Sequence, residues 1–437
     1  MNGFAKRQLI IALGITGMLG VAGNSFASGF QLWEQDGASV GNYHAGYAAL
    51  AEDASTAFYN PAGITRIKNQ QLVLSGDGVM TAFKYQGTIG VNTILAGTPQ
   101  SVTAQGGNFG FVPALHYVAP INDYIGFGFS VDVPFGLKTT YGRKTIIRYA
   151  ATTTSATVVD ISPSLGFQLT EKASIGLGFD IQRMYAEFDQ VGGLGFPTVD
   201  AESVNKVNDT GYGCHLGALY QFSSDTRMGL SYHSQVVHHL NGSSSFVGPL
   251  ATIFAGGPYS SHAYSNITLP AYTALSGYRK ITPEVAIMAS AIYTQWNIFK
   301  ITSIHNASGI QGLAPSRTIS VAAPQFYNNT WNFSVGADYQ ATDKIKLRTG
   351  IGYDQTPTND ANRNITLPDN NRYVFAVGGH YQSSKALGYD LGWSHFMVSQ
   401  TSINPPPLVS GDQSVTTNGK VNGGADVLAA QLTWNIE

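Results

Sequence analysis

The residues best equipped for chemistry lie close together in one short stretch of the chain. It contains Ser231, His233, Ser234, His238 and His239. A serine hydroxyl beside an imidazole could supply the nucleophile and the general base of a hydrolase, provided that a carboxylate orients the base. However, Ser231 and His233 are neighbours on one face of a single extended segment, and no partnered acid is in view. We therefore interpret the histidines as structural and predict no catalytic centre, no metal site and no cofactor.

The composition limits the elements that can position these side chains. The 437 residues include 24 basic and 26 acidic ones, or 11% charged, against about 25% in typical soluble domains. The chain also has 50 glycines and is rich in Phe and Tyr. A net charge of −2 excludes a strongly basic nucleic-acid-binding protein. The single cysteine, Cys214, excludes a disulfide framework. This composition is atypical of a cytosolic enzyme, and the length suits one large barrel or two or three soluble domains.

The N-terminus has the three parts of a secretory signal peptide. Lys6 and Arg7 precede an apolar run from 9 to 21, and Ser25-Phe26-Ala27 places small residues where a signal peptidase cleaves. We predict that residues 1–27 are removed after Ala27. An uncleaved membrane anchor is the alternative, but the run is shorter than the ~20 residues of a helical span, and no later apolar stretch is long enough for one.

Large apolar side chains alternate with small or polar ones along many segments. Between 125 and 135 the odd positions are all large and apolar, whereas the even positions are Gly, Ser, Asp or Pro. A period of two predicts strands with one apolar and one polar face. The same alternation recurs in the segments 159–168, 331–340, 345–354 and 428–437.

Two further features favour a membrane barrel over a soluble sandwich, which also alternates. Aromatic residues gather near the strand ends, as interfacial girdles require. Short polar links, such as Asn122-Asp123 and Ala341-Thr342-Asp343, alternate with long links near 87–105, 137–150, 187–209, 241–263, 301–323, 357–370 and 403–421. These links predict an all-β fold of fourteen antiparallel strands that close into an outer-membrane barrel over residues 71–437. A large secreted β-sandwich or solenoid is the alternative.

Residues 28–70 do not alternate. They are rich in Gly, Ala and short polar residues, and 48–54 is typical of a helical turn or two. Because a ring of fourteen strands encloses a lumen wide enough to need filling, we expect this segment to lie inside the barrel as a plug, or hatch. A disordered periplasmic tail is the alternative, but the segment is neither charge-rich nor of low complexity.

Several segments together resemble the FadL-type long-chain fatty acid transporters of Gram-negative outer membranes. They run in order from the expected mature N-terminus toward the C-terminal strand, so the resemblance covers essentially the whole mature chain. The segments are 28–32 (SGFQL), 51–63 (AEDASTAFYNPAG), 118–123 (VAPIND), 269–270 (LP), 276–278 (SGY), 293–296 (YTQW), 348–351 (RTGI) and 362–369 (NRNITLPD), with Arg372.

The resemblance implies a barrel with a hatch, a hydrophobic groove among the extracellular loops, an interior pocket and a side opening in the wall. It implies uptake of long-chain fatty acids by binding in groove and pocket, rearrangement of the hatch and lateral release into the membrane. Such a dry route avoids rehydrating an acyl chain, whose burial is worth about 0.8 kcal/mol per CH₂. Transport of aromatic or other uncharged hydrocarbons is the main alternative. A general porin and an outer-membrane lipid hydrolase are further alternatives.

The segment Val133-Pro134-Phe135-Gly136 is the predicted lateral gate. Pro134 has no N–H to donate to a strand ladder, and Gly136 removes a side chain from the wall. In the resemblance, this stretch falls where the third strand bends inward beside the side opening. Asn60-Pro61-Ala62 matches the hatch segment that packs near that bend, where it would form a fixed turn. A strand end at Pro134 and an ordinary turn at Asn60 are the alternatives.

The predicted ligand contacts lie in the hatch and in two long loops. The resemblance places Phe30, near the hatch N-terminus, closest to bound cargo. Exposed apolar clusters in loops often mark binding sites, although loop tips also pack on each other. The predicted groove residues are Leu194, Phe196, Phe246, Val247, Leu250, Ile253 and Phe254.

The predicted head-group site departs from the family pattern. The carboxylate-binding arginine of the family aligns with Gln190, and the basic residue closest to the family's lysine is Arg317. The cargo therefore stays open between a fatty acid and an uncharged hydrocarbon. Expected partners are this cargo, outer-membrane lipid and lipopolysaccharide, and the barrel assembly machinery, with no nucleic acid. We expect a monomer with its N-terminus in the periplasm or the lumen and its long loops outside the cell.

Overall fold

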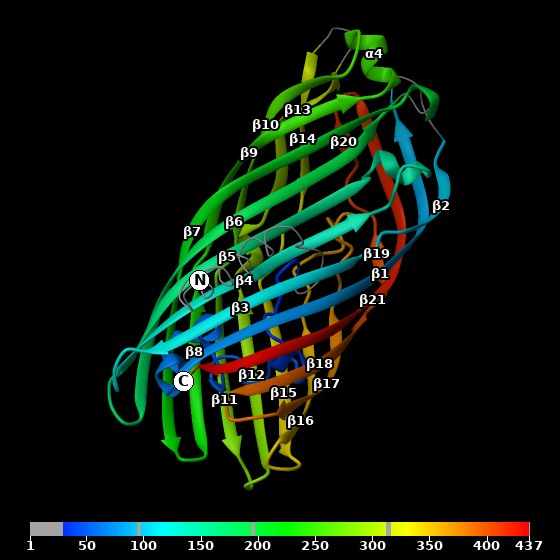
Figure 1. The fold of residues 1–437 in the computed structure, drawn as a ribbon. Coiled ribbons are helices and arrows are strands. Elements are labelled where there is room, and N and C mark those ends of the chain that lie inside the picture. The colour runs from blue at the N-terminus through cyan, green and yellow to red at the C-terminus, as the bar shows by residue number, and fades with distance from the viewer. Residues whose placement is uncertain (1–28, 94–97, 194–196, 312–315, 437) are drawn as a thin grey trace, which may run out of the picture.

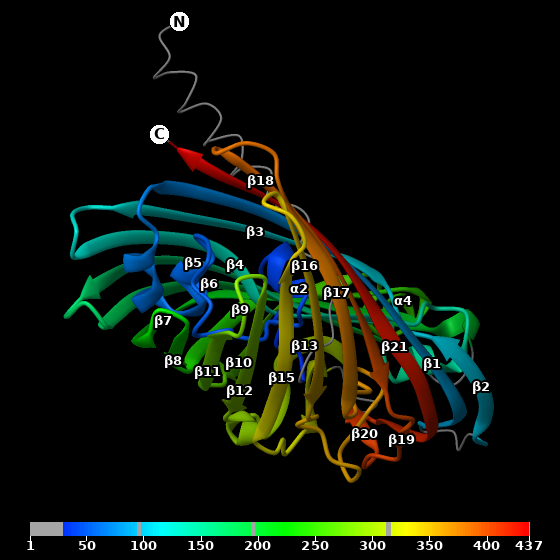
Figure 2. The ribbon, with the colours of Figure 1, turned by 90° about the horizontal axis from the view of Figure 1, so that it is seen from below.

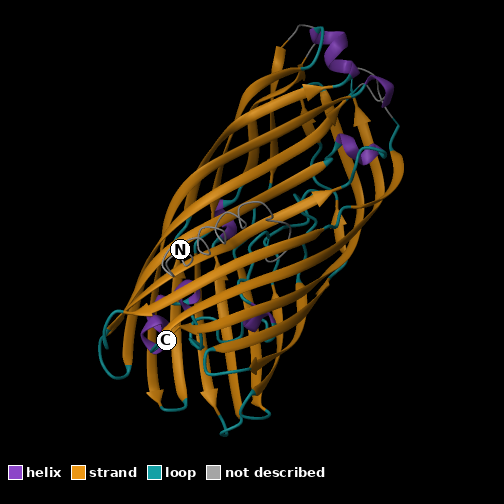
Figure 3. Ribbon diagram, in the orientation of Figure 1, coloured by secondary structure: helices purple, strands orange, loops and turns teal. Residues whose placement is uncertain are grey.

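The alternating segments become strands that pair side by side into a closed, tilted barrel (Figure 1). This computed structural model describes residues 29–93, 98–193, 197–311 and 316–436. Strands dominate these ranges, and the helices are short (Figure 3). No helix in the described ranges is both long and apolar enough to cross a bilayer. The predicted signal peptide at 1–27 lies outside the described residues.

Several strands of the barrel consist of two segments separated by an irregularity. In chain order the segments are β1 (Gln70–Asn92), β2 (Gln100–Gln105), β3 (Phe109–Pro120), β4 (Ile125–Thr140), β5 (Thr153–Gln168), β6 (Ala173–Gly192), β7 (Ala201–Ser223), β8 (Thr226–His233), β9 (Val236–Val247), β10 (Tyr259–Leu269), β11 (Tyr272–Lys280), β12 (Val285–Thr294), β13 (Ile301–Gln311), β14 (Ser316–Pro324), β15 (Thr330–Gln340), β16 (Ile345–Asp354), β17 (Arg372–Gln382), β18 (Leu387–Val398), β19 (Thr401–Ile403), β20 (Leu408–Ser410) and β21 (Gln413–Ile436). Where two consecutive segments continue one another, as β2 and β3 do along β1, they form one barrel strand. The described residues then form fourteen strands, which confirms the predicted fold class.

The first and the last strand close the barrel. β1 pairs with β21 along its whole length, from Gln70 opposite Ile436 to Asn92 opposite Ser414. A closed ladder gives the backbone the partners that lipid cannot supply. The predicted alternation is also confirmed, because apolar side chains such as Ile351 on β16 point outward whereas Arg348 on the same strand is buried inside.

The six short links are tight turns as predicted, but five of the long links are largely strand. β1 with β2, β6 with β7, β9 with β10, β13 with β14, and β20 with β21 continue far into the ranges 87–105, 187–209, 241–263, 301–323 and 403–421. The expectation of loops there is wrong, because stretches such as Ser243-Ser244-Ser245 are polar on both faces. A backbone ladder needs no apolar side chains, so the period-two signal disappears while the strand continues.

The segment before β1 lies inside the barrel (Figure 2). It contains α2 (Gly37–Val40), α3 (Thr56–Tyr59) and the 3₁₀ turn η1 (Pro61–Arg66). The Asp36 carboxylate caps α2 by accepting a 2.6 Å hydrogen bond from the Ser39 N–H. Trp33 and Tyr43 are buried in a core shared with the inner faces of the strands. The remaining helical turns connect strands: η2 (Ile146–Tyr149), η3 (Pro197–Val199), α4 (Pro249–Ala255) and η4 (Trp296–Ile298).

Ion pairs fasten the hatch to β16. The Glu52 carboxylate lies 2.8 Å from Lys346 Nζ and 3.6 Å from Arg348 Nη2. Burial alone would raise the pKa of Glu52, but the two cations outweigh burial and lower that pKa to about 2. The pair therefore stays ionised at neutral pH.

Glycines on the inner wall let the hatch backbone lie directly against the strands. A Cβ atom at Gly176 on β6 would lie 2.2 Å from the carbonyl carbon of Pro61. One at Gly217 on β7 would lie 1.9 Å from Asn60 Oδ1. The atoms that such a Cβ would meet belong to the hatch backbone and to a fixed turn, which cannot adjust locally. A side chain at either position must therefore push the whole hatch segment away from the wall.

We expect Gly176→Ala to loosen the hatch and to destabilise the protein by about 1–3 kcal/mol, as overpacking does. The matched control is Gly277→Ala on β11, where an added Cβ meets nothing within 4 Å. Limited proteolysis of the purified barrel should cut the hatch faster in Gly176→Ala than in Gly277→Ala. Equal digestion rates and equal unfolding midpoints for the two variants would contradict this packing argument.

Candidate functional site

β4 bends into the lumen in its second half. A bulge interrupts its pairing with β5 between Asp132 and Phe135, at the point where Pro134 has no N–H to donate. All residues from Asp132 to Leu137 are buried, so the alternation seen earlier in β4 is lost. The predicted gate residues Val133–Gly136 occupy the centre of this bend.

The hydrogen-bond ladder between β3 and β4 is interrupted beside the bend, and this unpaired stretch of wall is called the opening below. The ladder that joins the described parts of the two strands ends at Leu115 opposite Val131. Gly110–Ala114 of β3 pairs with β1 on its other side. A 3.2 Å hydrogen bond from the Thr140 N–H to the Gly106 carbonyl oxygen rejoins the two sides. The bend therefore coincides with a stretch of wall that lacks its ladder.

The start of the hatch takes the place of β3 along the bend. The Leu32 N–H donates to the Pro134 carbonyl oxygen at 2.8 Å, and the Gly136 N–H donates to the Phe30 carbonyl oxygen at 2.8 Å. These bonds make the hatch segment a short extra strand that lines the opening from inside.

Two glutamines complete this pairing. Gln31 forms an antiparallel bridge with Phe135. The Gln35 side-chain amide donates to the Val133 carbonyl oxygen at 2.9 Å, and its Oε1 accepts from the Val133 N–H at 3.0 Å. Residues 30–35 thus supply the backbone partners that β3 does not provide.

Phe30 connects the bend to an apolar cavity. Its ring centroid lies 4.9 Å from that of Trp296, 5.5 Å from that of Phe299 and 5.8 Å from that of Phe135. Phe30 and Leu137 both line a space of about 990 Å³ that includes open solvent. The other apolar lining residues are Ala150, Ala151, Ala156, Met184, Phe188, Ile267, Phe299, Ile304, Ala307, Val321, Ala323, Tyr327, Leu367 and Leu408.

The polar lining of this cavity contains amides and hydroxyls but no cation. Gln190 is one of the lining residues, and its Nε2 donates to the Ser410 hydroxyl. The described residues that line the space include one acidic residue, Asp189. They include no Lys, Arg or His. Arg317 does not line it, because its exposed side chain lies over Tyr259, 5.9 Å from the ring centroid. The structure thus brings Gln190, but not Arg317, to the cavity.

Asn60-Pro61-Ala62 forms a fixed turn that contacts a different part of the wall. Asn60 Oδ1 accepts from the Ala62 N–H at 3.1 Å, and its Nδ2 donates to the Ala218 carbonyl oxygen on β7 at 3.1 Å. The hydrogen bonds that the hatch makes to the gate residues in the described ranges come instead from residues 30–35. Phe58, just before the turn, lines a small cavity together with Pro134.

The predicted groove residues at the loop tips mostly pack on one another. Phe246 on β9 and Leu250 on α4 are buried in a small core, against which Phe254 also packs. Val247 and Ile253 are exposed. None of these five lines the lumen cavity. Two further predicted groove residues lie outside the described part of the chain: Leu194 and Phe196.

The serines and histidines between 231 and 239 do not assemble a catalytic triad with one another. The Ser231 hydroxyl is buried without a hydrogen-bond partner, so it contacts no base. The spacing Gly37-x-Ser39-x-Gly41 matches a nucleophile elbow, but Ser39 lies on α2 in the hatch. Its hydroxyl bonds the Asp36 carbonyl oxygen and the Tyr59 hydroxyl, both at 3.1 Å.

Sequence reasoning missed four residues of this site. Gln31 and Trp296 lie within segments that carried the family resemblance, which was the available signal for them. Gln35 gave no signal, because its contact with β4 joins positions 98 residues apart. Pro113 lies on the β3 edge that faces the opening. Like Pro134, it is a proline within a strand, and that was the available signal for an interrupted ladder.

A closed barrel with apolar outer faces, a filled lumen and an internal apolar cavity is the architecture of an outer-membrane transport protein. A model of the family described as "Outer membrane protein transport protein (OMPP1/FadL/TodX)" matches residues 18–435. The chain belongs to this family, whose members are outer-membrane transporters of Gram-negative bacteria and not enzymes.

Individual relatives agree with this assignment and confirm the resemblance. The long-chain fatty acid transport protein of Salmonella typhi is 27% identical over 436 residues, covering 92% of this chain and 94% of the relative. The crystal structure of a Pseudomonas aeruginosa FadL homologue superposes with a TM-score of 0.83 at 25% identity, covering 94% of this chain and 100% of the other. The Pseudomonas putida toluene transporter TodX shares the fold, with a TM-score of 0.69 at 17% identity and coverage of 94% and 100%.

Proposed function

We propose that this protein takes up long-chain fatty acids across the outer membrane and releases them sideways through its wall. Cargo enters the cavity beside Phe30 and leaves between β3 and β4 once residues 30–35 move off the bent strand. One observation carries the proposal. The same short hatch segment borders the cavity through the Phe30 ring and occupies the wall opening through its backbone.

The chemistry of an acyl chain favours this route over an axial pore. Each CH₂ group that returns to water costs about 0.8 kcal/mol, so a long chain is retained strongly wherever it stays dry. The hatch fills the barrel axis with packed side chains and ion pairs. An exit through the wall leads from an apolar cavity directly into lipid.

The head group would be held by neutral donors. Gln190, Asn205 and Gln325 line the cavity and offer side-chain amide groups. The acidic residue in the same space, Asp189, offers an anion no positive partner. This lining favours an uncharged hydrocarbon as the second candidate cargo, because a carboxylate gains no ion pair there.

Uptake assays separate the two cargoes. In a Gram-negative host that lacks its own fatty acid transporter, we expect this protein to take up radiolabelled oleate faster than the empty vector. Oleyl alcohol should be taken up at a similar rate, since no cation selects the carboxylate. Toluene uptake without oleate uptake would favour the second candidate. No uptake above the vector for any of the three compounds would refute both.

Substitutions sharpen the head-group argument. Gln190→Arg should raise the preference for oleate over oleyl alcohol about tenfold, as an ion pair worth ~1.4 kcal/mol does. Arg317→Gln, which lies away from the cavity, should leave the preference unchanged and serves as the matched control.

A further inference from the structure

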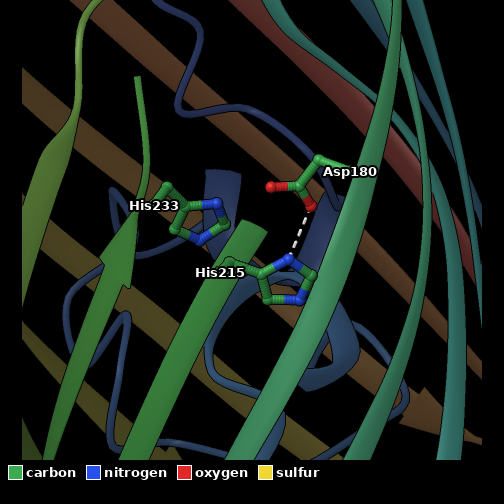
Figure 4. A group of neighbouring side chains, drawn as sticks. All are labelled: Asp180, His215 and His233. Atoms are coloured by element: carbon green, nitrogen blue, oxygen red, sulfur yellow. Dashed lines mark hydrogen bonds and ion pairs between the residues drawn. The ribbon is translucent and has the colours of Figure 1, made fainter. Parts of the chain in front are cut away.

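Three buried side chains gather on the inner wall next to the bent strand (Figure 4). They are Asp180 on β6, His215 on β7 and His233 on β8, with 2%, 0% and 5% of their surfaces exposed. One potential ligand atom of each lies within 4.8 Å of those of the other two. The barrel register brings them together, because His215 pairs with His233 and Gly178 pairs with His215. The transport route proposed above uses none of them.

His215 contacts the hatch and the Asp180 carboxylate through its two ring nitrogens. Its Nε2 donates to the Ala57 carbonyl oxygen in the hatch at 3.1 Å. Its Nδ1 lies 2.6 Å from Asp180 Oδ1. A metal ion bound to both atoms would lie about 2.0–2.2 Å from each and would move them to more than about 3 Å apart.

His233 supplies a second nitrogen without a partner. Its Nε2 is buried and has no hydrogen bond within the described residues. The His233 ring stacks between two other rings. Its centroid lies 5.0 Å from that of His215 and 4.4 Å from that of Tyr272. Figure 4 shows the second carboxylate oxygen of Asp180 pointing toward the His233 ring. A buried polar atom in this state loses its solvation without compensation.

Space and further donors exist beside the cluster. Asp180 and His233 border a small space, with room for about one water-sized group, together with Asp160 and Gln182. Asp160 Oδ1 and Gln182 Oε1 are also buried without partners. The wall makes room for the imidazole, since a Cβ atom at Gly178 would lie 2.0 Å from His215 Cε1.

We propose that Asp180, His215 and His233 bind a divalent transition-metal ion, with Zn²⁺ as the best match. Two imidazole nitrogens and a carboxylate oxygen are typical Zn²⁺ ligands, and Asp160 or a water in the cavity provides the fourth. The Nε2–H bond to Ala57 is the outer contact that normally fixes the tautomer of a metal-binding histidine. The bound ion would join β6, β7 and β8 to α3 of the hatch. This site is independent of the cargo.

The test uses the untagged mature barrel in detergent micelles, stripped of metal with a chelator. Titration calorimetry with Zn²⁺ should give one ion per chain, and Co²⁺ should develop the visible absorption of a four-coordinate site. If neither ion binds, the proposal fails.

Variants locate the ion. His233→Gln should weaken Zn²⁺ binding about 100-fold or more, because it removes a direct ligand. His238→Gln is the matched control, since His238 is also buried but lies on β9 outside the cluster, with its Nδ1 3.6 Å from Asp209 Oδ2. Gly178→Ala, which pushes against the His215 ring, should also weaken binding. Unchanged Zn²⁺ affinity in both His233→Gln and Gly178→Ala would overturn the assignment. The circular dichroism signal of the β-sheet checks that each variant is folded.

Discussion

Oxidised Gln31→Cys/Phe135→Cys protein should transport cargo at least about tenfold more slowly than wild type, and a reductant should restore transport. The two residues face each other in an antiparallel bridge. Flanking hydrogen bonds from Leu32 and Gly136 make this a non-hydrogen-bonded pair, in which the Cα atoms lie about 4.5 Å apart. That separation suits a disulfide. The crosslink would hold the hatch segment in the wall opening, so lateral release would stop.

The controls for this disulfide test the effect of losing the native Gln31 and Phe135 side chains. Gln31 Oε1 accepts a 3.1 Å hydrogen bond from the Thr294 hydroxyl, and Phe135 belongs to the aromatic cluster around Phe30. Each single cysteine variant must therefore transport normally under oxidising conditions. The native Cys214 is exposed and should be replaced by Ala. Full transport by a protein whose crosslink is proven by mass spectrometry would show that residues 30–35 need not move.

Phe30→Glu is expected to weaken cargo binding at least about tenfold and to slow uptake to a similar degree. Phe30 is 2% exposed and packs against three aromatic rings. A carboxylate at this position is buried without a counter-ion, at a cost that the site avoids by admitting water or expelling the segment. Either response removes the dry end of the cavity. Quenching of Trp296 fluorescence by a spin-labelled fatty acid measures binding, and radiolabelled oleate measures uptake.

Two variants show whether the effect belongs to position 30. Phe30→Leu keeps the site apolar and should retain most binding and transport. Phe254→Glu adds the same charge on α4, away from the lumen cavity. If Phe254→Glu impaired uptake as much as Phe30→Glu, the loop tips rather than the cavity would control the route.

The parts of this structure that depend on local pattern could be predicted from the sequence. Alternation between 125 and 135 predicts β4, and Pro134 marks where its ladder breaks, since both are properties of a few consecutive residues. The resemblance added the hatch and drew attention to Phe30.

Contacts that depend on the register of distant strands could not be predicted in this way. Asp180 and His215 are 35 positions apart and meet only because β6 and β7 pair in one particular register. The same holds for residues 30–35, which approach β4 from inside the lumen. The placement of Asn60 against β7 instead of the bend follows from the glycines at 176 and 217, whose role appears only when the hatch is in place.

An opening in a sheet creates two free edges, and free edges tend to recruit strands from other molecules. Here each edge carries a proline, Pro113 on one side and Pro134 on the other, and neither can donate a hydrogen bond. The β4 edge also turns inward, where the hatch backbone covers it. The incomplete wall is therefore a poor template for strand addition, which keeps neighbouring copies in a crowded membrane from joining edge to edge.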